Sequence, residues 1–416
     1  MKHLLAICWE MPPLSGPRAV QVTRTLAALG TRGWSSRVIC FRPRSNRYHQ
    51  DHRVSLEDVS GGLASQIGVP SPEEWFPVRA LWRLAPPLKR FPDEKRVWMP
   101  AALRAARQAL QSAPADLIVS FAPPWTDHLI GLRLQQETGL PWVAHFSDPW
   151  ADSPYLPGGS AARQRAAAWE EQVIAAAARV VFVTRHTRDR VMAKYPRAWA
   201  AKADVVPQAF DSAPGPGAPS PLDRKRPMRV IYTGRFYDGI RTPLALLDAV
   251  ARLHRESPLQ GRLEMEFIGA DMAAYAGRAA SLGLGSFVTF TSRCSPAEAR
   301  TRAASADVLL VIDAPAQDGG LFLPSKLIEY LPMRRPILGL TPAAGPSDEL
   351  IRELGYRTVP PDEVTAIAAA LGELLQAHIS GRLVPSLQHD TVTARFTVDA
   401  TAKKFAVVLD RAMQQP

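Results

Sequence analysis

Short apolar runs alternate along this chain with amphipathic segments of helical period. In the first half these runs are continuous, which is typical of strands buried on both faces of a parallel sheet. They predict strands at residues 4–8, 37–41, 116–121, 142–146, 179–183 and 204–207. The segments between them predict helices at residues 20–29, 101–111, 126–139, 161–178 and 188–194. Residues 43–100 interrupt this order, and their Pro- and aromatic-rich composition predicts an irregular excursion.

A Pro- and Gly-rich linker at residues 211–221 separates this half from a second alternation of the same kind. After it, strands are predicted at 228–233, 263–268, 288–290 and 308–312, and helices at 243–255, 295–304, 347–355, 363–378 and 398–413. The predicted fold class is α/β, with two Rossmann-like, doubly wound parallel-sheet domains facing across a cleft. The expected boundaries are 1–210 for the first domain, 211–227 for the linker, 228–396 for the second domain, and 397–416 for a final helix that packs back on the first domain.

The bulk composition indicates a globular protein. Of the 416 residues, 46% are hydrophobic and 21% are charged, which is ordinary for a chain with a packed core. Cys8, Cys40 and Cys294 are too few and too scattered for a disulfide or zinc framework, so they predict reduced thiols. No apolar run reaches transmembrane length, and Met1 leads into a strand without the features of a signal peptide. We therefore expect a cytoplasmic location.

The net charge of +11 lies almost entirely in the first half of the chain. Residues 1–210 carry 27 Lys and Arg against 17 Asp and Glu, whereas residues 211–416 carry 23 against 22. Such an excess indicates an anionic partner, which could be lipid headgroups, a lipid-linked acceptor or nucleic acid. A coding bias toward arginine would give the same composition, and the charge count does not decide between these explanations.

Aromatic and basic residues are interleaved within the excursion. The apolar groups at 75–77, 81–82 and 86–88 alternate with Arg79, Arg83, Lys89 and Arg90. Apolar surface edged by cations suits a peripheral contact with an anionic membrane, which would be the inner face of the plasma membrane. Alternatively, the stretch packs over the first domain as ordinary structure. Nucleic acid is not expected as a partner, because no stacking platform or helix-turn-helix pattern accompanies the charge.

One segment of the second half has the pattern of a loop, a short helix and a strand. Residues 318–320 form a turn, and Pro324 and Ser325 suit a helix start with a capping hydroxyl. Lys326 and Glu329 lie three residues apart and so share one face. A helix N-terminus attracts anions, Lys326 adds a full charge, and Glu329 can accept hydrogen bonds from a ribose. The segment suits a nucleotide-diphosphate site, although an ordinary amphipathic helix has the same pattern.

Charged and polar residues follow several of the predicted strands, where α/β sheets bind ligands. His145 and Asp148 occupy such a place in the first half, each as a functional or a hydrogen-bonded structural residue. In the second half Arg235 and Arg241 follow one strand, and together with Lys326 they predict a binding place for a departing diphosphate. No G-x-G-x-x-G sequence follows any predicted strand, which argues against a dinucleotide-dependent oxidoreductase.

Five motifs in order connect this sequence with a known family. They lie at residues 12–16 (PPLSG), 145–150 (HFSDPW), 206–211 (VPQAFD), 232–236 (YTGRF) and 324–331 (PSKLIEYL). In them the sequence resembles the retaining nucleotide-sugar glycosyltransferases of family GT4, which have the GT-B fold. Within that family it is most similar to the branch of bacterial surface-polysaccharide transferases. The resemblance covers almost the whole chain.

The resemblance implies donor-binding roles in the second domain. By it, Arg235 and a second basic residue hold the donor diphosphate. The family's lysine falls on Ile240, so Arg241 is the expected substitute. Glu329 matches the later of the family's paired glutamates and would bind the donor ribose. Further donor contacts are implied for Gly16, which matches a glycine beside the donor phosphates, and for Gly234 and Ser325.

The sequence also departs from the family pattern. The earlier of the paired glutamates falls on Leu321, so Asp318 or loop backbone would have to replace its contact with the sugar hydroxyls. The family's Asn-Gly after the Val-Pro step is Gln208-Ala209 here. These departures leave open a catalytically inactive sugar-nucleotide-binding subunit, beside a sugar-nucleotide epimerase or phosphorylase of the same fold.

The reaction implied by the resemblance is hexosyl transfer, with retention of anomeric configuration, from a nucleotide-diphosphate sugar to a glycan or lipid-linked acceptor. The implied catalytic residues are Arg235, Arg241, Lys326 and His145, and Asp148 and Trp150 lie on the acceptor side. No carboxylate pair presents itself as nucleophile and acid, which fits front-face attack with the leaving phosphate accepting the acceptor's proton. The sequence contains no Asp-x-Asp, so neither a metal nor a cofactor is expected besides the donor.

Overall fold

The computed structural model describes residues 1–45, 48, 55–85, 92–153, 156, 159–211, 226–269, 273–292, 294–316 and 320–414. It divides into two compact units, Met1–Ala209 with Val398–Pro416 (unit 1) and Phe210–Thr397 (unit 2). Most of the expected linker, residues 212–225, lies outside the described residues. Each unit is built on a parallel sheet, which confirms the predicted α/β class.

Unit 1 contains a seven-stranded sheet in the order β3-β2-β1-β4-β5-β6-β7. Its strands are β1 Lys2–Ile7, β2 Trp34–Phe41, β3 Ala64–Val69, β4 Leu117–Ala122, β5 Trp142–Phe146, β6 Arg179–Phe182 and β7 Ala203–Val205. The helices are α1 Pro17–Gly30, α2 Leu56–Ser60, α3 Phe76–Leu84, α4 Met99–Ser112, α5 Thr126–Thr138, α6 Gly159–Ala176, α7 Arg185–Met192 and α15 Val398–Met413. The short 3-10 helices are η1 Pro72–Glu74, η3 Glu94–Trp98 and η4 Arg197–Lys202.

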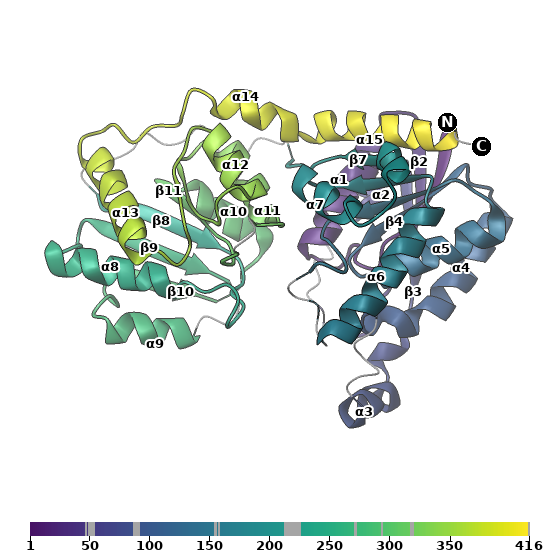
Figure 1. The fold of residues 1–416 in the computed structure, drawn as a ribbon, viewed down its shortest axis with the longest axis horizontal. Coiled ribbons are helices and arrows are strands. Elements are labelled where there is room, and N and C mark those ends of the chain that lie inside the picture. The colour runs from purple at the N-terminus through teal and green to yellow at the C-terminus, as the bar shows by residue number, and fades with distance from the viewer. Residues whose placement is uncertain are drawn as a thin grey trace. The chain divides into compact units, whose positions relative to one another are not determined.

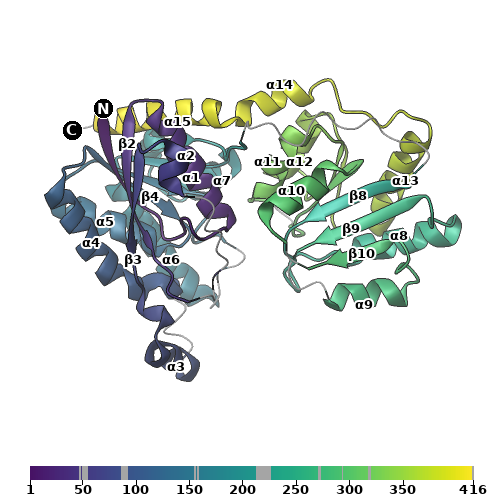
Figure 2. The ribbon, with the colours of Figure 1, turned by 180° about the vertical axis from the view of Figure 1, so that it is seen from behind.

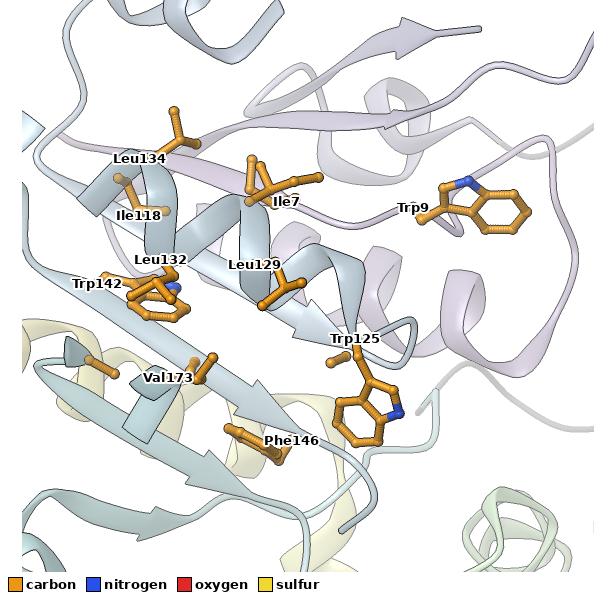
Figure 3. Close-up of a cluster of buried hydrophobic side chains, with 14 of the residues drawn as sticks. Ile7, Trp9, Ile118, Trp125, Leu129, Leu132, Leu134, Trp142, Phe146 and Val173 are labelled. Atoms are coloured by element: carbon orange, nitrogen blue, oxygen red, sulfur yellow. The ribbon is translucent and has the colours of Figure 1, made fainter. Parts of the chain in front are cut away.

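The strands of unit 1 are apolar on both faces because helices cover both. Leu5 and Ile7 of β1 belong to a cluster with side chains of α4, α5 and α6. Leu4 and Ala6, which alternate with them, pack with side chains of α1 and α15. Figure 3 shows the first cluster, in which leucines of α5 pack with Ile118 of β4 and Trp142 of β5. The last helix, α15, contributes Phe405 to the second cluster, and the figures show it running along unit 1 (Figure 2).

Unit 2 contains a six-stranded sheet in the order β10-β9-β8-β11-β12-β13. Its strands are β8 Met228–Thr233, β9 Leu263–Ile268, β10 Val288–Thr291, β11 Val308–Ile312, β12 Ile337–Leu340 and β13 Thr358–Val359. The helices are α8 Leu244–Glu256, α9 Ala273–Ser281, α10 Pro296–Ala304, α11 Ser325–Tyr330, α12 Pro346–Glu353, α13 Val364–Ile379 and α14 His389–Thr393, with the 3-10 turns η5 Leu331–Met333 and η6 Ala394–Phe396. In both sheets every strand pair is parallel, so the carboxyl ends of the strands lie along one edge.

The expectation that residues 43–100 are irregular was wrong for much of its length. This segment contains α2, β3 and α3. The strand β3 has no continuous apolar run, because Ser65, Gln66 and Gly68 interrupt it. It lies at the edge of the sheet, where one of its sides has no neighbouring strand and polar side chains are tolerated. None of the helices in the described part of the chain has both the length and the apolar character that a bilayer crossing requires.

Candidate functional site

In unit 2 the loop after β8 turns sharply at Gly234. Its φ of +136° lies in a region that side-chain-bearing residues rarely adopt. A Cβ at this position would lie 2.5 Å from Nζ of Lys326 and 2.9 Å from its Cε. Glycine therefore permits the backbone turn, and it also leaves the space that the lysine ammonium occupies, which a Cβ would displace. This close approach joins the end of β8 to the start of α11.

The ammonium group of Lys326 is enclosed by protein. The residue as a whole is partly exposed, but its Nζ is buried and has no hydrogen-bond acceptor in the described part of the chain. Nζ lies 3.6 Å from the centre of the Tyr232 ring, a cation–π distance. Burial lowers the pKa of Lys326 well below its usual range, the charge of Arg241 lowers it further, and Asp313 acts in the opposite direction. A buried amine of this kind would be stabilised in its charged form by an anion.

Arg241 is held by the loop that begins at Gly234. The backbone N–H of Arg241 donates to the carbonyl of Tyr237 at 2.8 Å, and the N–H of Tyr237 donates back to the carbonyl of Arg241 at 2.9 Å. Nη2 of Arg241 donates to the carbonyl of Arg235 at 2.9 Å, whereas its Nε is buried without a hydrogen-bond acceptor among the described residues. The structure thus brings Arg241 and Lys326 to the same edge of the sheet, each with an N–H group that could bind an anion.

Arg235 lies in the same loop but is exposed. Its carbonyl oxygen accepts from Arg241, and the Tyr232 hydroxyl donates to the same oxygen at 3.3 Å. The backbone of Arg235 therefore organises the loop, while its side chain lies at the surface. Tyr232 belongs to the motif at residues 232–236, but the sequence predicted no role for its side chain.

Asp313 is the acidic group of this edge, and it too was not expected from the sequence. It directly follows β11, and its carboxyl is hydrogen-bonded to Ser347. Burial raises the pKa of Asp313, and Ser347, Arg241 and Lys326 lower it. The rule that drew attention to His145 and Asp148, a polar residue at the carboxyl end of a strand, would have found Asp313.

The helix α11 begins at Ser325, as expected, but the capping interaction differs. Pro324 is the residue before the first turn, and no side chain caps the helix, so the prediction of a capping hydroxyl was wrong. Tyr330 at the other end ties α11 to β8, because its hydroxyl accepts from the backbone N–H of Thr233 at 2.9 Å. Glu329 is partly exposed one turn after the start of the helix.

The other two donor-side candidates of unit 2, Asp318 and Leu321, precede this helix in the sequence. Leu321 is partly exposed and offers no carboxylate, and Asp318 lies outside the described residues.

A pocket lies at the carboxyl edge of the sheet in unit 1. Polar side chains of four segments contribute to it, together with the rings of Phe121 and Phe405; the polar residues include Arg18, Gln21, His145, Ser147, Gln208 and Thr401. Three of their atoms are buried without a hydrogen-bond partner among the described residues, namely His145 Nδ1, Ser147 Oγ and Gln208 Oε1. Unsatisfied buried polar atoms around one small pocket can bind a water molecule or a single hydroxyl group of a ligand.

Arg18 is the basic group of this edge, and its charge acts on the pKa values of His145 and Asp148 after the larger effect of burial. Its Nη2 donates to the carbonyl of Ala122 at the end of β4, at 2.9 Å. Burial, and secondarily the charge of Arg18, lowers the pKa of His145 to about 3, so the imidazole is neutral at physiological pH. Burial raises the pKa of Asp148, whereas Arg18 lowers it. Arg18 lies in the first turn of α1, before the start of the helix predicted at residues 20–29, and the sequence predicted no role for it.

Trp150 and Gly16 are both accounted for by packing. Trp150 is fully buried and stacks on Trp125, with ring centres 4.9 Å apart, so it offers no surface to an acceptor. Gly16 precedes the first turn of α1, and a Cβ there would lie 1.6 Å from Oε1 of Glu10. A larger residue at position 16 would require the Glu10 carboxylate to move.

Comparison with known proteins agrees with this architecture. Residues 18–209 match a family model described as glycosyl transferase 4-like domain, and residues 227–377 match one described as glycosyl transferases group 1. The two matches together cover more than four fifths of the chain. None of the curated proteins matches this chain in sequence.

Solved structures share the fold at low sequence identity. Sucrose-phosphate synthase from Thermosynechococcus elongatus has a TM-score of 0.70 at 16% identity, with 97% of each chain covered. The lipopolysaccharide outer core galactosyltransferase WaaB has a TM-score of 0.64 at 16% identity, with 99% of each chain covered. A structure described as trehalose-6-phosphate from E. coli, bound with UDP-2-fluoro glucose, has a TM-score of 0.65 at 14% identity, with both chains fully covered.

Proposed function

Because the chain belongs to the GT4-type glycosyltransferases with the GT-B fold, we propose that it transfers a hexosyl group from a nucleotide-diphosphate sugar with retention of configuration. The acceptor is a glycan or a lipid-linked glycan in polysaccharide biosynthesis. No divalent metal takes part in the proposed reaction.

The pair of cations at the edge of unit 2 carries this proposal. Lys326 Nζ and Arg241 Nε are both buried, and neither has a hydrogen-bond acceptor in the described part of the chain. Burying a charged group without a partner is costly, so the arrangement favours an anion with several oxygens. A diphosphate satisfies both groups, and the exposed Arg235 lies in the same loop.

These cations would also promote the chemistry. When the glycosidic bond breaks, negative charge develops on the departing phosphate, and preorganised cations in a buried site stabilise it without reorganisation. We assign to Lys326 and Arg241 the charge neutralisation that a divalent ion supplies in other transferases. Glu329, one turn into α11, is the proposed acceptor of the ribose hydroxyls.

Unit 1 would bind the acceptor. In its pocket, His145 is a neutral hydrogen-bonding group, since its pKa of about 3 makes it too weak a base to deprotonate a sugar hydroxyl at neutral pH. The proposed proton acceptor is therefore the departing phosphate itself. Asp148, which lies near the same edge, is the acceptor-side carboxylate of this proposal; Trp150 supports its loop from within the core.

The proposal is tested first by donor binding. A thermal-shift screen with UDP, GDP, ADP and their sugars should raise the melting temperature with one nucleotide family, because ligand binding stabilises the folded state by mass action. Turnover with that donor is then followed by NMR, and the product should keep the anomeric configuration of the donor. Activity should persist in excess EDTA. Inversion, or loss of activity restored by a divalent ion, would contradict the corresponding part of the proposal.

A catalytically inactive binding subunit remains a second candidate because Leu321 offers no carboxylate where the resemblance expects one. It predicts a thermal shift with a nucleotide sugar but no turnover with any acceptor. Nucleotide release that depends on the acceptor would exclude both this candidate and an epimerase. Peripheral contact with an anionic membrane is a separate proposal, since it concerns a helix of unit 1 outside these sites.

A further inference from the structure

The helix α3 exposes an unusual amount of apolar surface. None of its nine residues is buried, although all of them are described. The exposed fractions are 73% for Phe76, 50% for Leu81 and 85% for Leu84, and Trp75 directly before the helix is 55% exposed. In both ribbon views α3 extends away from the rest of unit 1 (Figures 1 and 2). Contiguous exposed apolar side chains of this kind mark an interaction surface.

The exposed apolar residues share one face of the helix. Pro77, Leu81 and Leu84 follow one another at intervals of four and three, and Phe76 flanks them. Arg79 and Arg83 lie four residues apart along the adjoining face. The helix thus carries an apolar stripe with arginines along its border, while its inner side packs on η1.

The charged residues of α3 itself, Arg79 and Arg83, are both basic. Residues 75–90 contain four basic residues and no Asp or Glu. Two tryptophans, Trp75 and Trp82, lie in the same stretch. Tryptophan favours the boundary between the headgroups and the acyl chains, and basic side chains beside it pair with anionic headgroups.

We propose that α3 is a membrane-binding helix that places its apolar stripe into the interface of a bilayer rich in anionic lipid. Its arginines then lie at the level of the lipid phosphates. This occupant fits better than a second copy of the chain, since two such helices face to face would bring like charges together. The inference is independent of the reaction proposed above, because α3 contributes no residue to either site.

Liposome flotation tests the apolar part of the proposal. The full chain is mixed with vesicles of phosphatidylcholine containing about a third phosphatidylglycerol, and with vesicles of phosphatidylcholine alone. The double variant Leu81→Gln/Leu84→Gln should lower binding to the anionic vesicles roughly tenfold or more, since affinity scales with the apolar area inserted. The matched control is Val384→Gln/Leu387→Gln, which changes two exposed residues of unit 2 and should bind as the unchanged protein does.

A second pair of variants tests the charge. Arg83→Gln should reduce binding to the anionic vesicles roughly fivefold, because a basic residue near a charged surface contributes on the order of 1 kcal/mol. Arg300→Gln makes the same change in net charge on exposed surface of unit 2 and should have little effect. All these residues are solvent-exposed, so the melting temperatures should remain unchanged.

Several outcomes would overturn the proposal. Equal losses in the α3 variants and their matched controls would show that general charge or hydrophobicity governs binding. Equal affinity for neutral and anionic vesicles would contradict the proposed pairing of the arginines with anionic headgroups. A dimer in sedimentation velocity that Leu81→Gln/Leu84→Gln dissociates, without vesicle binding by the unchanged protein, would assign α3 to a second copy.

Discussion

The two units present the same architectural edge with different electrostatic character. In unit 2, the carboxyl edge of the sheet carries Lys326 and Arg241 beside one buried acid, Asp313. In unit 1, the corresponding edge carries Arg18 among the acid Asp148 and the neutral imidazole of His145. A parallel sheet determines where a ligand binds, and the residues at the strand ends determine which ligand it is.

The net charge of the two halves of the chain would place an anion-binding site in the first half, whereas the pair of cations proposed to bind the diphosphate lies in the second. The first half of the chain holds nearly all of the positive excess, yet Lys326 and Arg241, whose buried N–H groups have no acceptor among the described residues, lie in the nearly neutral second half. Net charge describes long-range attraction and solubility, whereas a binding site depends on a few buried groups. Part of the excess in the first half belongs to the stretch around α3, outside the pocket of that unit.

The largest expected effect comes from removing the ammonium group of Lys326 from unit 2. Lys326→Ala should lower turnover with the identified donor by about 10²–10³-fold, which is typical for the loss of one preorganised group that stabilises developing charge. Steady-state kinetics measure the effect. Lys403→Ala, which removes an exposed lysine from α15, is the matched control and should keep full activity. Turnover within a factor of three of the unchanged protein would contradict the role of Lys326 and weaken the contrast between the units.

A smaller effect is expected when the space for Lys326 is filled. Gly234→Ala places a methyl group 2.5 Å from Nζ at a φ of +136°, so the ammonium must move. We expect UDP affinity to fall by about tenfold or more in isothermal titration calorimetry, the loss of a charged hydrogen bond being roughly 1.5–3 kcal/mol.

Gly239 provides a matched control in the same loop. It also has a positive φ, of +70°, but a Cβ there would meet nothing within 4 Å. Gly239→Ala therefore introduces backbone strain without displacing the lysine, and it should leave UDP affinity nearly unchanged. Equal losses in both variants would mean that loop strain, and not the position of Lys326, governs binding.

In unit 1 the expected effect is smaller still and appears in the pH profile. Arg18 lowers the pKa of Asp148, so Arg18→Gln should raise that pKa. If the acceptor site needs the ionised carboxylate, the acidic limb of kcat/KM against pH moves to higher pH, and activity at pH 7 falls by less than about tenfold. Arg18→Lys keeps the charge and should restore the profile. An unchanged acidic limb in Arg18→Gln would show that acceptor binding does not depend on the ionisation of Asp148.

The sequence predicted the fold well where burial imposes a simple pattern. Strands such as β1, β4 and β11 are covered on both faces, so most of their residues are buried and apolar. The edge strand β3 was missed because Ser65, Gln66 and Gly68 interrupt its apolar residues, as an edge position tolerates. In the site, Lys326 was predicted from its helix start, but its contacts with Tyr232 and Gly234 were not. Those contacts join segments about ninety residues apart, and local patterns carry no information about such pairs.

The smallest expected signal is a proton taken up with the donor. Burial and Arg241 lower the pKa of Lys326 in the free protein. A bound diphosphate favours the ammonium form and raises that pKa again. Between the two values each binding event takes up as much as one proton, and affinity falls as pH rises through the pKa of the bound state. At pH 8 the phosphates of UDP are already ionised, since their second pKa is about 6, so uptake reports on the protein.

Calorimetry of UDP binding in two buffers of different ionisation enthalpy measures this uptake. Lys326→Arg is the informative variant, because a guanidinium stays charged at every accessible pH and cannot take up a proton. It should bind UDP without linked protonation, whereas Lys403→Arg should behave as the unchanged protein does. Equal uptake in Lys326→Arg and in the unchanged protein would assign the proton to another group, such as Asp313. The distinction between the units would then rest on the acid of unit 2 and not on its buried lysine.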